Sequence, residues 1–131
     1  MENKDTSSKT ASLIKTILYW VTTSIIVLET AAGAQWDLAR NPYVTKVFAE
    51  LGYPLYLLTI IGLWKIPAAI TLIIPRFPLI KEWAYAGLFF IYTGAAASHI
   101  AMGDYKAVWG LLVFSGITVV SWALRPANRR M

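Results

Sequence analysis

Cysteine is absent from this chain of 131 residues, and histidine occurs once. The lack of thiols excludes a disulfide scaffold, a thiolate metal site and dithiol chemistry. A single histidine excludes a bis-histidine haem. Charged residues are also scarce, at 15%, whereas an ordinary soluble domain has about a quarter. With 57% hydrophobic residues, this composition argues against a water-soluble monomer and excludes a disordered chain.

Sequence motifs for several common chemistries are missing as well. The chain contains no P-loop and no GxGxxG string, so nothing points to nucleotide binding. No serine stands in a recognisable nucleophile motif. The chemistry of the chain must therefore be sought in its apolar segments.

Four apolar stretches are long enough to cross a bilayer, which takes roughly 20 mostly apolar residues. They run over about 13–34, 55–74, 83–102 and 107–124. None shows the sustained two-residue alternation of a β-strand. The sequence therefore predicts one domain over 1–131, an all-α membrane protein built as a four-transmembrane-helix bundle.

The connection between the first two spans, residues 35–54, is long enough to hold a helix of its own. Asn41 can cap that helix, Pro42 suits its first position, and Gly52 suits the residue after its end. Its apolar residues fall on one face, which predicts a short amphipathic helix. Such a helix lies either in the membrane interface or over the mouth of the bundle.

Basic residues predict the orientation and account for the net charge of +5. With four spans, both termini and the 75–82 loop share one side, whose basic residues are Lys4, Lys9, Lys15, Arg76, Lys81, Arg125, Arg129 and Arg130. The other side has only Arg40, Lys46 and Lys106. The positive-inside rule then predicts a multi-pass protein of the cytoplasmic (inner) membrane with both termini in the cytoplasm. The arginines at 125, 129 and 130 are interpreted as a topology signal in preference to an anionic-lipid site.

A secretory signal is the alternative interpretation of the first span. Lys9 and Lys15 precede an apolar stretch that ends in Ala32-Gly33-Ala34, which resembles a cleavage site. However, the stretch is longer than a usual signal core, and Glu29 interrupts the approach to the site. A retained helix is therefore the favoured prediction.

Three ionisable side chains lie inside the predicted spans: Glu29, Lys65 and His99. A charge near the bilayer centre costs a few kcal/mol, so such a residue faces protein or water and has a partner. At 1.5 Å per residue all three reach the outer half of one bundle, and Asp104 follows soon after His99. The sequence predicts that Glu29 and Lys65 pair within a polar cavity that opens outward. A buried ion pair that only fixes helix register, or anchoring at lipid headgroups, stays open as an alternative.

Two aromatic residues complete the candidate site. Tyr92 lies seven positions before His99 and so shares its helix face. Trp64, next to Lys65, either fills the core or stacks on a flat ligand.

Small residues and a proline predict local packing. Pro67 removes one backbone donor two residues after Lys65, and a kink there would open space beside the lysine. Gly94 and Ser98 form a small-xxx-small pair, which predicts a close helix contact.

Several strings in the chain resemble the DoxX-like family of small membrane proteins. They are LGYP at 51–54, GLWK at 62–65 and KEWAYAG at 81–87, with Gly-Ala at 94–95, Ser-His at 98–99 and Gly-Asp at 103–104. The resemblance implies four membrane helices with a helical loop after the first, and relatives that are membrane partners of redox enzymes. Ala32-Gly33 departs from the Ser-Gly pair often found in the family.

The resemblance and the polar residues together predict a function. We expect a protein that is non-catalytic alone, with a cavity near Glu29, Lys65, His99, Asp104, Tyr92 and Trp64. It binds a quinone-like or other small apolar molecule, the one cofactor considered, or serves as an accessory subunit of a membrane redox complex. The expected partners are the lipid bilayer and either a redox enzyme or a second copy of the chain. We expect neither a nucleic acid nor a metal ion to bind. A transporter or proton carrier acting as an oligomer, and a structural membrane partner or assembly factor, stay open.

Overall fold

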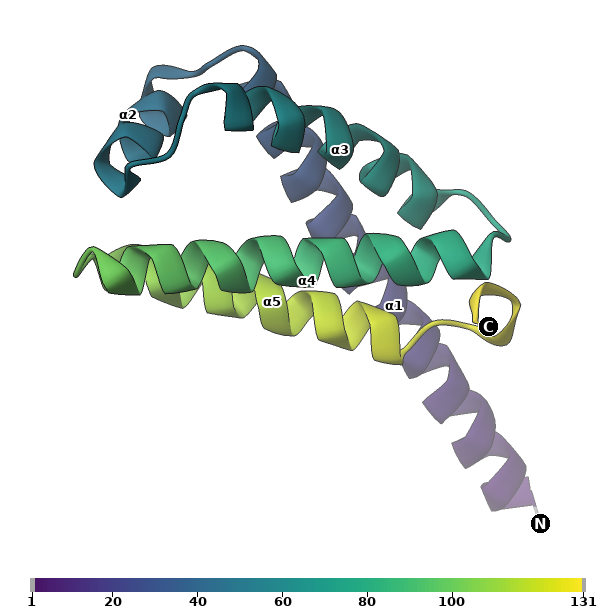
Figure 1. The fold of residues 1–131 in the computed structure, drawn as a ribbon. Coiled ribbons are helices and arrows are strands. Elements are labelled where there is room, and N and C mark those ends of the chain that lie inside the picture. Colours follow the sequence, from purple (N-terminus) through teal and green to yellow (C-terminus); the bar gives the residue numbers. More distant parts are fainter. Residues whose placement is uncertain (1, 131) are drawn as a thin grey trace.

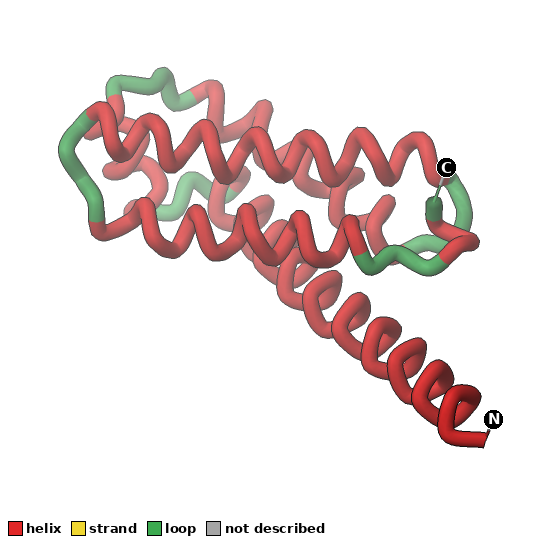
Figure 2. Tube along the Cα trace, turned by 90° about the horizontal axis from the view of Figure 1, so that it is seen from below, coloured by secondary structure: helices red, strands yellow, loops and turns green. Residues whose placement is uncertain are grey.

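The computed structural model describes residues 2–130, with side chains from Asp5 onward (Figures 1 and 2). This part of the chain forms five α-helices and one short 3-10 turn, without a strand. Their bounds are α1 Glu2–Leu38, α2 Pro42–Leu51, α3 Tyr56–Ile73, α4 Pro78–Ala101, α5 Lys106–Ala123 and η1 Ala127–Arg129. The predicted all-α class is confirmed.

Three helical segments are long and apolar enough to cross a membrane: Asp5–Leu38, Tyr56–Ile73 and Lys106–Ala123. They coincide with the first, second and fourth predicted spans. The third predicted span falls in α4, whose apolar character is diluted by tyrosines, small residues and His99. The helices also expose large apolar side chains, such as Leu28 at 70% and Phe90 at 68%. Apolar surface on this scale is typical of a membrane protein that contacts lipid.

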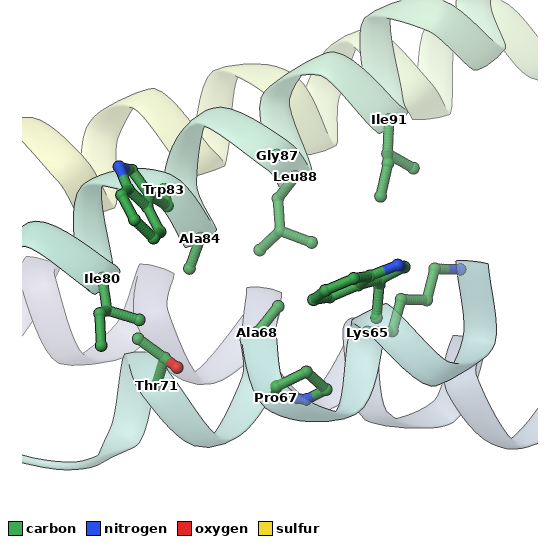
Figure 3. A pocket seen from close by; sticks show the side chains of 11 residues that line it. Lys65, Pro67, Ala68, Thr71, Ile80, Trp83, Ala84, Gly87, Leu88 and Ile91 are labelled. Carbon is green, nitrogen blue, oxygen red and sulfur yellow. The ribbon is translucent and has the colours of Figure 1, made fainter. Parts of the chain in front are cut away.

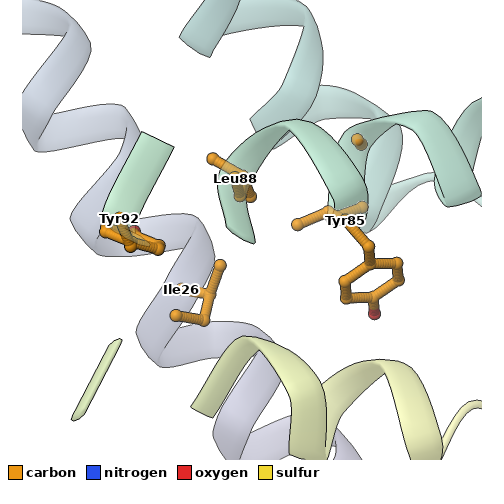
Figure 4. Packing of buried hydrophobic residues seen from close by; sticks show 6 residues of the cluster. Ile26, Tyr85, Leu88 and Tyr92 are labelled. Atoms are coloured by element: carbon orange, nitrogen blue, oxygen red, sulfur yellow. The ribbon is translucent and has the colours of Figure 1, made fainter. Parts of the chain in front are cut away.

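A single stripe of α1 faces the other helices. The buried residues of α1 recur every three or four positions, as one helix face requires; they are Tyr19, Thr23, Ile26, Thr30, Ala34 and Asp37. Ile26 packs in the central core against Leu88 and Tyr92 of α4 (Figure 4). α1 crosses the antiparallel pair of α4 and α5 obliquely (Figure 1).

The first half of α1 extends beyond the bundle (Figures 1 and 2). Every described residue before Tyr19 is exposed. The helix has 37 residues and is therefore about 55 Å long at 1.5 Å per residue. It begins well before the predicted boundary at 13 and continues past 34 to Leu38, since no proline interrupts it at either boundary and Gly33 stays within the helix.

α2 has the caps that the sequence predicts. The side chain of Asn41 accepts a hydrogen bond from the backbone N–H of Tyr43 at 2.9 Å, and Pro42 occupies the first turn. Gly52 ends the helix with φ of 78°, a left-handed conformation that glycine adopts without strain. The helix and both caps are thus confirmed.

Candidate functional site

An ion pair joins α1 and α3 at the end of the bundle that carries α2, here called the pocket end. Lys65 Nζ lies 2.9 Å from Asp37 Oδ2, and the two side chains are only 14% and 8% exposed. Glu29 instead accepts a hydrogen bond from the hydroxyl of Tyr92. The predicted pairing of Glu29 with Lys65 is therefore wrong.

Asp37 is a residue that sequence reasoning missed. The first span was expected to stop at 34, which assigned Asp37 to a loop, whereas α1 continues to Leu38. The signal was the spacing, because Asp37 continues the buried stripe of α1 three residues after Ala34. The flexible stem of Lys65 carries its ammonium along α3 toward that last turn of α1.

Two glycines make room for this ion pair. A Cβ on Gly33 of α1 would lie 2.8 Å from Lys65 Nζ. A Cβ on Gly62 of α3 would lie 3.1 Å from Asp37 Cβ and 2.8 Å from Leu38 Cγ. Each of these two helices therefore has a glycine opposite the charged residue of the other helix, and α1 and α3 approach each other closely at this point. A Cβ on Gly94 would meet nothing within 4 Å, so the close approach expected there is not found.

His99 has the carboxylate partner that the sequence suggested. Its Nδ1 lies 3.2 Å from Asp104 Oδ2, and the backbone N–H of Asp104 donates to the His99 carbonyl at 2.9 Å. The histidine is buried at the end of α4, while Asp104 is exposed in the following turn. The exposed carboxylate of Asp104 thus fixes the orientation of the buried His99 ring.

Four of the six predicted site residues line one pocket of about 340 Å³: Glu29, Lys65, Tyr92 and His99. Asp37 lines it as well. Its apolar wall comes from α2, α3, α4 and the start of α5, including Phe48, Leu51, Ile61, Ile91 and Leu111. A neighbouring hollow of about 360 Å³ shares Glu29, Asp37, Lys65 and His99 and continues against α5. We call the first of these spaces the polar pocket.

Trp64 lies apart from this pocket. It is 70% exposed and lines a groove of about 280 Å³ between α3 and α4 (Figure 3). Pro67 and Trp83 line the same groove, and Lys65 borders both spaces. Asp104 lines neither and reaches the polar pocket only through His99.

The opposite end, here called the tail end, holds buried cations. The Arg129 guanidinium donates to the carbonyls of Leu72, Ile73 and Ile74 at 3.1, 3.1 and 3.2 Å. Lys81 donates to the carbonyls of Thr71 and Ile74. These carbonyls end α3, where the last turn lacks helical donors and the helix dipole favours cations.

Arginines interpreted as a topology signal thus also hold the fold together. Arg125 pairs with Glu82 and stacks over Trp122, with its guanidinium carbon 5.1 Å from the ring centroid. Burial alone would raise the pKa of Glu82, but hydrogen bonds from Arg125 and Trp122 bring it below its ordinary value. Lys81 and Glu82 lie near the start of α4, before the predicted span. Burial, followed by the charge of Arg129, lowers the pKa of Lys81 to about 8.

Comparison with protein families gives a match over most of the chain. A family model described as the DoxX-like family matches residues 21–123, which include α2 to α5 and most of the buried face of α1. Comparison with curated proteins and with solved structures gives no match.

Proposed function

Since this chain belongs to the DoxX-like family, we propose that it is an integral membrane protein that binds a quinone-like or other small apolar molecule in its polar pocket. The protein is non-catalytic alone. It serves as the membrane subunit of a redox complex, and its partner supplies the electrons. No cysteine is available to change redox state within the chain.

The composition of the polar pocket carries this proposal. Ligand sites are mostly apolar clefts with a few convergent polar groups. Here Phe48, Ile61 and Ile91 supply apolar wall, and the Lys65 ammonium and the His99 ring supply hydrogen-bond donors. A quinone ring has the complementary chemistry, with flat apolar faces and carbonyl oxygens that accept hydrogen bonds.

We further propose that α4 is a fourth span and that α2 lies in the membrane interface. α4 has 24 residues, or about 36 Å at 1.5 Å per residue, enough for a hydrocarbon core of about 30 Å. It runs antiparallel to α5, which is itself apolar enough to cross (Figure 1). Both termini then lie together, and the basic residues of the tail end favour the cytoplasmic side.

The transporter alternative requires more than one copy. Thr23 and Tyr85 meet Ser121 at 2.6 and 2.8 Å, forming a hydroxyl cluster at the tail end. Between that cluster and the polar pocket lie Ile26 and Leu88, which are 0% and 2% exposed. This apolar layer interrupts a polar path through one chain.

Quinone binding in nanodiscs tests the proposal, with decylubiquinone as the probe. We expect saturable binding that His99→Ala weakens about tenfold, the loss of roughly 1.4 kcal/mol from one hydrogen bond. Tyr92→Phe should also weaken binding, because it leaves the Glu29 carboxylate in the pocket wall without its hydrogen bond.

Tyr56→Phe is the matched control, because Tyr56 is exposed and lines none of the spaces described above. It should bind the quinone as the wild type does. No saturable binding, or an equal loss in the control, would overturn the quinone assignment. Co-purification of a redox enzyme with the tagged protein tests the accessory role separately.

A further inference from the structure

A basic groove at the tail end is separate from the polar pocket. It has a volume of about 370 Å³ and lies between the projecting part of α1 and the segment after α5. Ser12, Lys15 and Thr16 form one wall, and Arg125, Ala127 and Arg130 belong to the other. Two segments far apart in the sequence thus build one site, which we call the tail groove.

The tail groove has an excess of positive charge. Within the part of the chain that the structure describes, Glu82 neutralises one of the three cations of the groove, Arg125. Among the side chains that the structure describes, no carboxylate is within ion-pair distance of Lys15 or Arg130. An anion that entered the groove would therefore meet two cations that no carboxylate of the described side chains neutralises.

Arg130 is held in place for such an anion. Its Nε donates to the Arg125 carbonyl at 2.6 Å and its Nη2 to the Ala123 carbonyl at 3.3 Å. The Nη1 amino group has no acceptor among the described residues. A guanidinium that is already oriented loses little freedom when it binds a phosphate.

Apolar side chains stand next to the tail groove on α1. Leu13 and Ile17 are 61% and 51% exposed, and each adjoins a residue that lines the groove. A single site thus offers cations for a headgroup and apolar surface for acyl chains. A soluble phosphate would use only the first of these.

We propose that the tail groove binds the phosphate of an anionic lipid headgroup, with Lys15 and Arg130 as its ligands. The acyl chains of that lipid lie along Leu13 and Ile17. The bound lipid bridges α1 and the C-terminal segment, two parts of the chain that meet the membrane surface at the same end.

Native mass spectrometry from mild detergent tests this proposal, with phosphatidylglycerol and phosphatidylcholine offered in equal amounts. We expect the wild type to retain phosphatidylglycerol preferentially. The double variant Lys15→Gln/Arg130→Gln should lose that preference roughly 30-fold, since each basic residue near an anionic surface contributes about fivefold. Ser12→Glu, which places a carboxylate in the groove at an exposed helical position, should abolish it without unfolding the protein.

The matched control is Lys9→Gln/Arg76→Gln, which removes the same charge from exposed sites outside the groove. It should retain the lipid as the wild type does. An equal loss in the control would show a general charge effect and overturn the site. Displacement of the lipid by inorganic phosphate at similar concentration would overturn the lipid assignment. Neither result bears on quinone binding in the polar pocket.

Discussion

At the scale of single residues, Asp37 and Lys65 form the ion pair that joins α1 to α3. Both side chains are mostly buried, so each charge loses most of its hydration. Their attraction offsets that cost only while both are present. The pair is therefore better regarded as a device that fixes the register of α1 against α3 than as a net source of stability.

Removing one partner should cost far more than removing both. We expect Lys65→Met and Asp37→Leu each to lower the free energy of unfolding by about 3–5 kcal/mol, because an unpaired buried charge remains. The double variant should recover most of the loss. Thermal unfolding in detergent measures this, with Glu29→Gln/Lys65→Met as the control pair. Recovery in that control instead of in the Asp37 double variant would contradict the observed pairing.

Lys81 makes stability depend on pH in alkaline solution. Its pKa is about 8 in the folded protein, below the ordinary lysine pKa of 10.5 that applies to the unfolded chain. Between these values the unfolded chain binds more protons, so stability rises with pH from about 8 to 10.5.

The melting temperature of the wild type should therefore increase between pH 7.5 and 9.5, a window set by the shifted pKa of Lys81. Lys81→Met should lack this increase, whereas Lys106→Gln, at an exposed lysine of the pocket end, should keep it. A flat wild-type profile would show that the Lys81 pKa is unshifted.

At the scale of elements, the contact between α1 and α3 depends on two glycines. Gly62 meets side-chain atoms of Asp37 and Leu38, whereas Gly116 of α5 has nothing within 4 Å of an added Cβ. Substitution of glycine by alanine should therefore affect stability differently at Gly62 of α3 and at Gly116 of α5.

Gly62→Ala should reduce the free energy of unfolding by about 1–3 kcal/mol, because the added methyl overpacks the helix contact. Gly116→Ala should be neutral or stabilise by up to about 1 kcal/mol, since alanine favours the helix. Chemical unfolding in detergent compares the two. Equal effects would mean that α1 and α3 do not approach closely at Gly62.

The sequence predicted which segments are helical better than it predicted where the helices end and which side chains pair. Apolar length located α1, α3 and α5, and local chemistry at Asn41 and Gly52 predicted both caps of α2. Pairing within the site depends on depth along each helix, so an error of four residues at the end of α1 hid Asp37. The role of Arg129 had no local signal, because its acceptors are backbone carbonyls 55–57 residues away.

At the scale of the whole molecule, the pocket end and the tail end differ in the charged groups that they carry. The pocket end combines acidic and basic side chains around an open space, while the tail end is dominated by cations bound to carbonyls. An apolar layer around Ile26 and Leu88 separates them. This polarity suits a protein whose ends face different compartments.

Labelling with a membrane-impermeant maleimide tests that orientation, because the chain has no cysteine of its own. Asn128 and Glu50 are exposed and lie near opposite ends. In intact cells we expect Glu50→Cys to react and Asn128→Cys to react only after permeabilisation. The reverse pattern would place the tail end outside.

The capping of α3 by Arg129 also has a consequence for biosynthesis. A ribosome adds about 5–20 residues per second, so the 55–57 residues between these groups take roughly 3–11 s to make. Throughout that interval α3 has been synthesised, yet the carbonyls of its last turn have no arginine to bind. The nascent chain must leave the carbonyls of Leu72 and Ile73 to water or to lipid headgroups, while Lys81 is already available to the carbonyl of Ile74. The bundle closes at the tail end only when translation has passed Arg129.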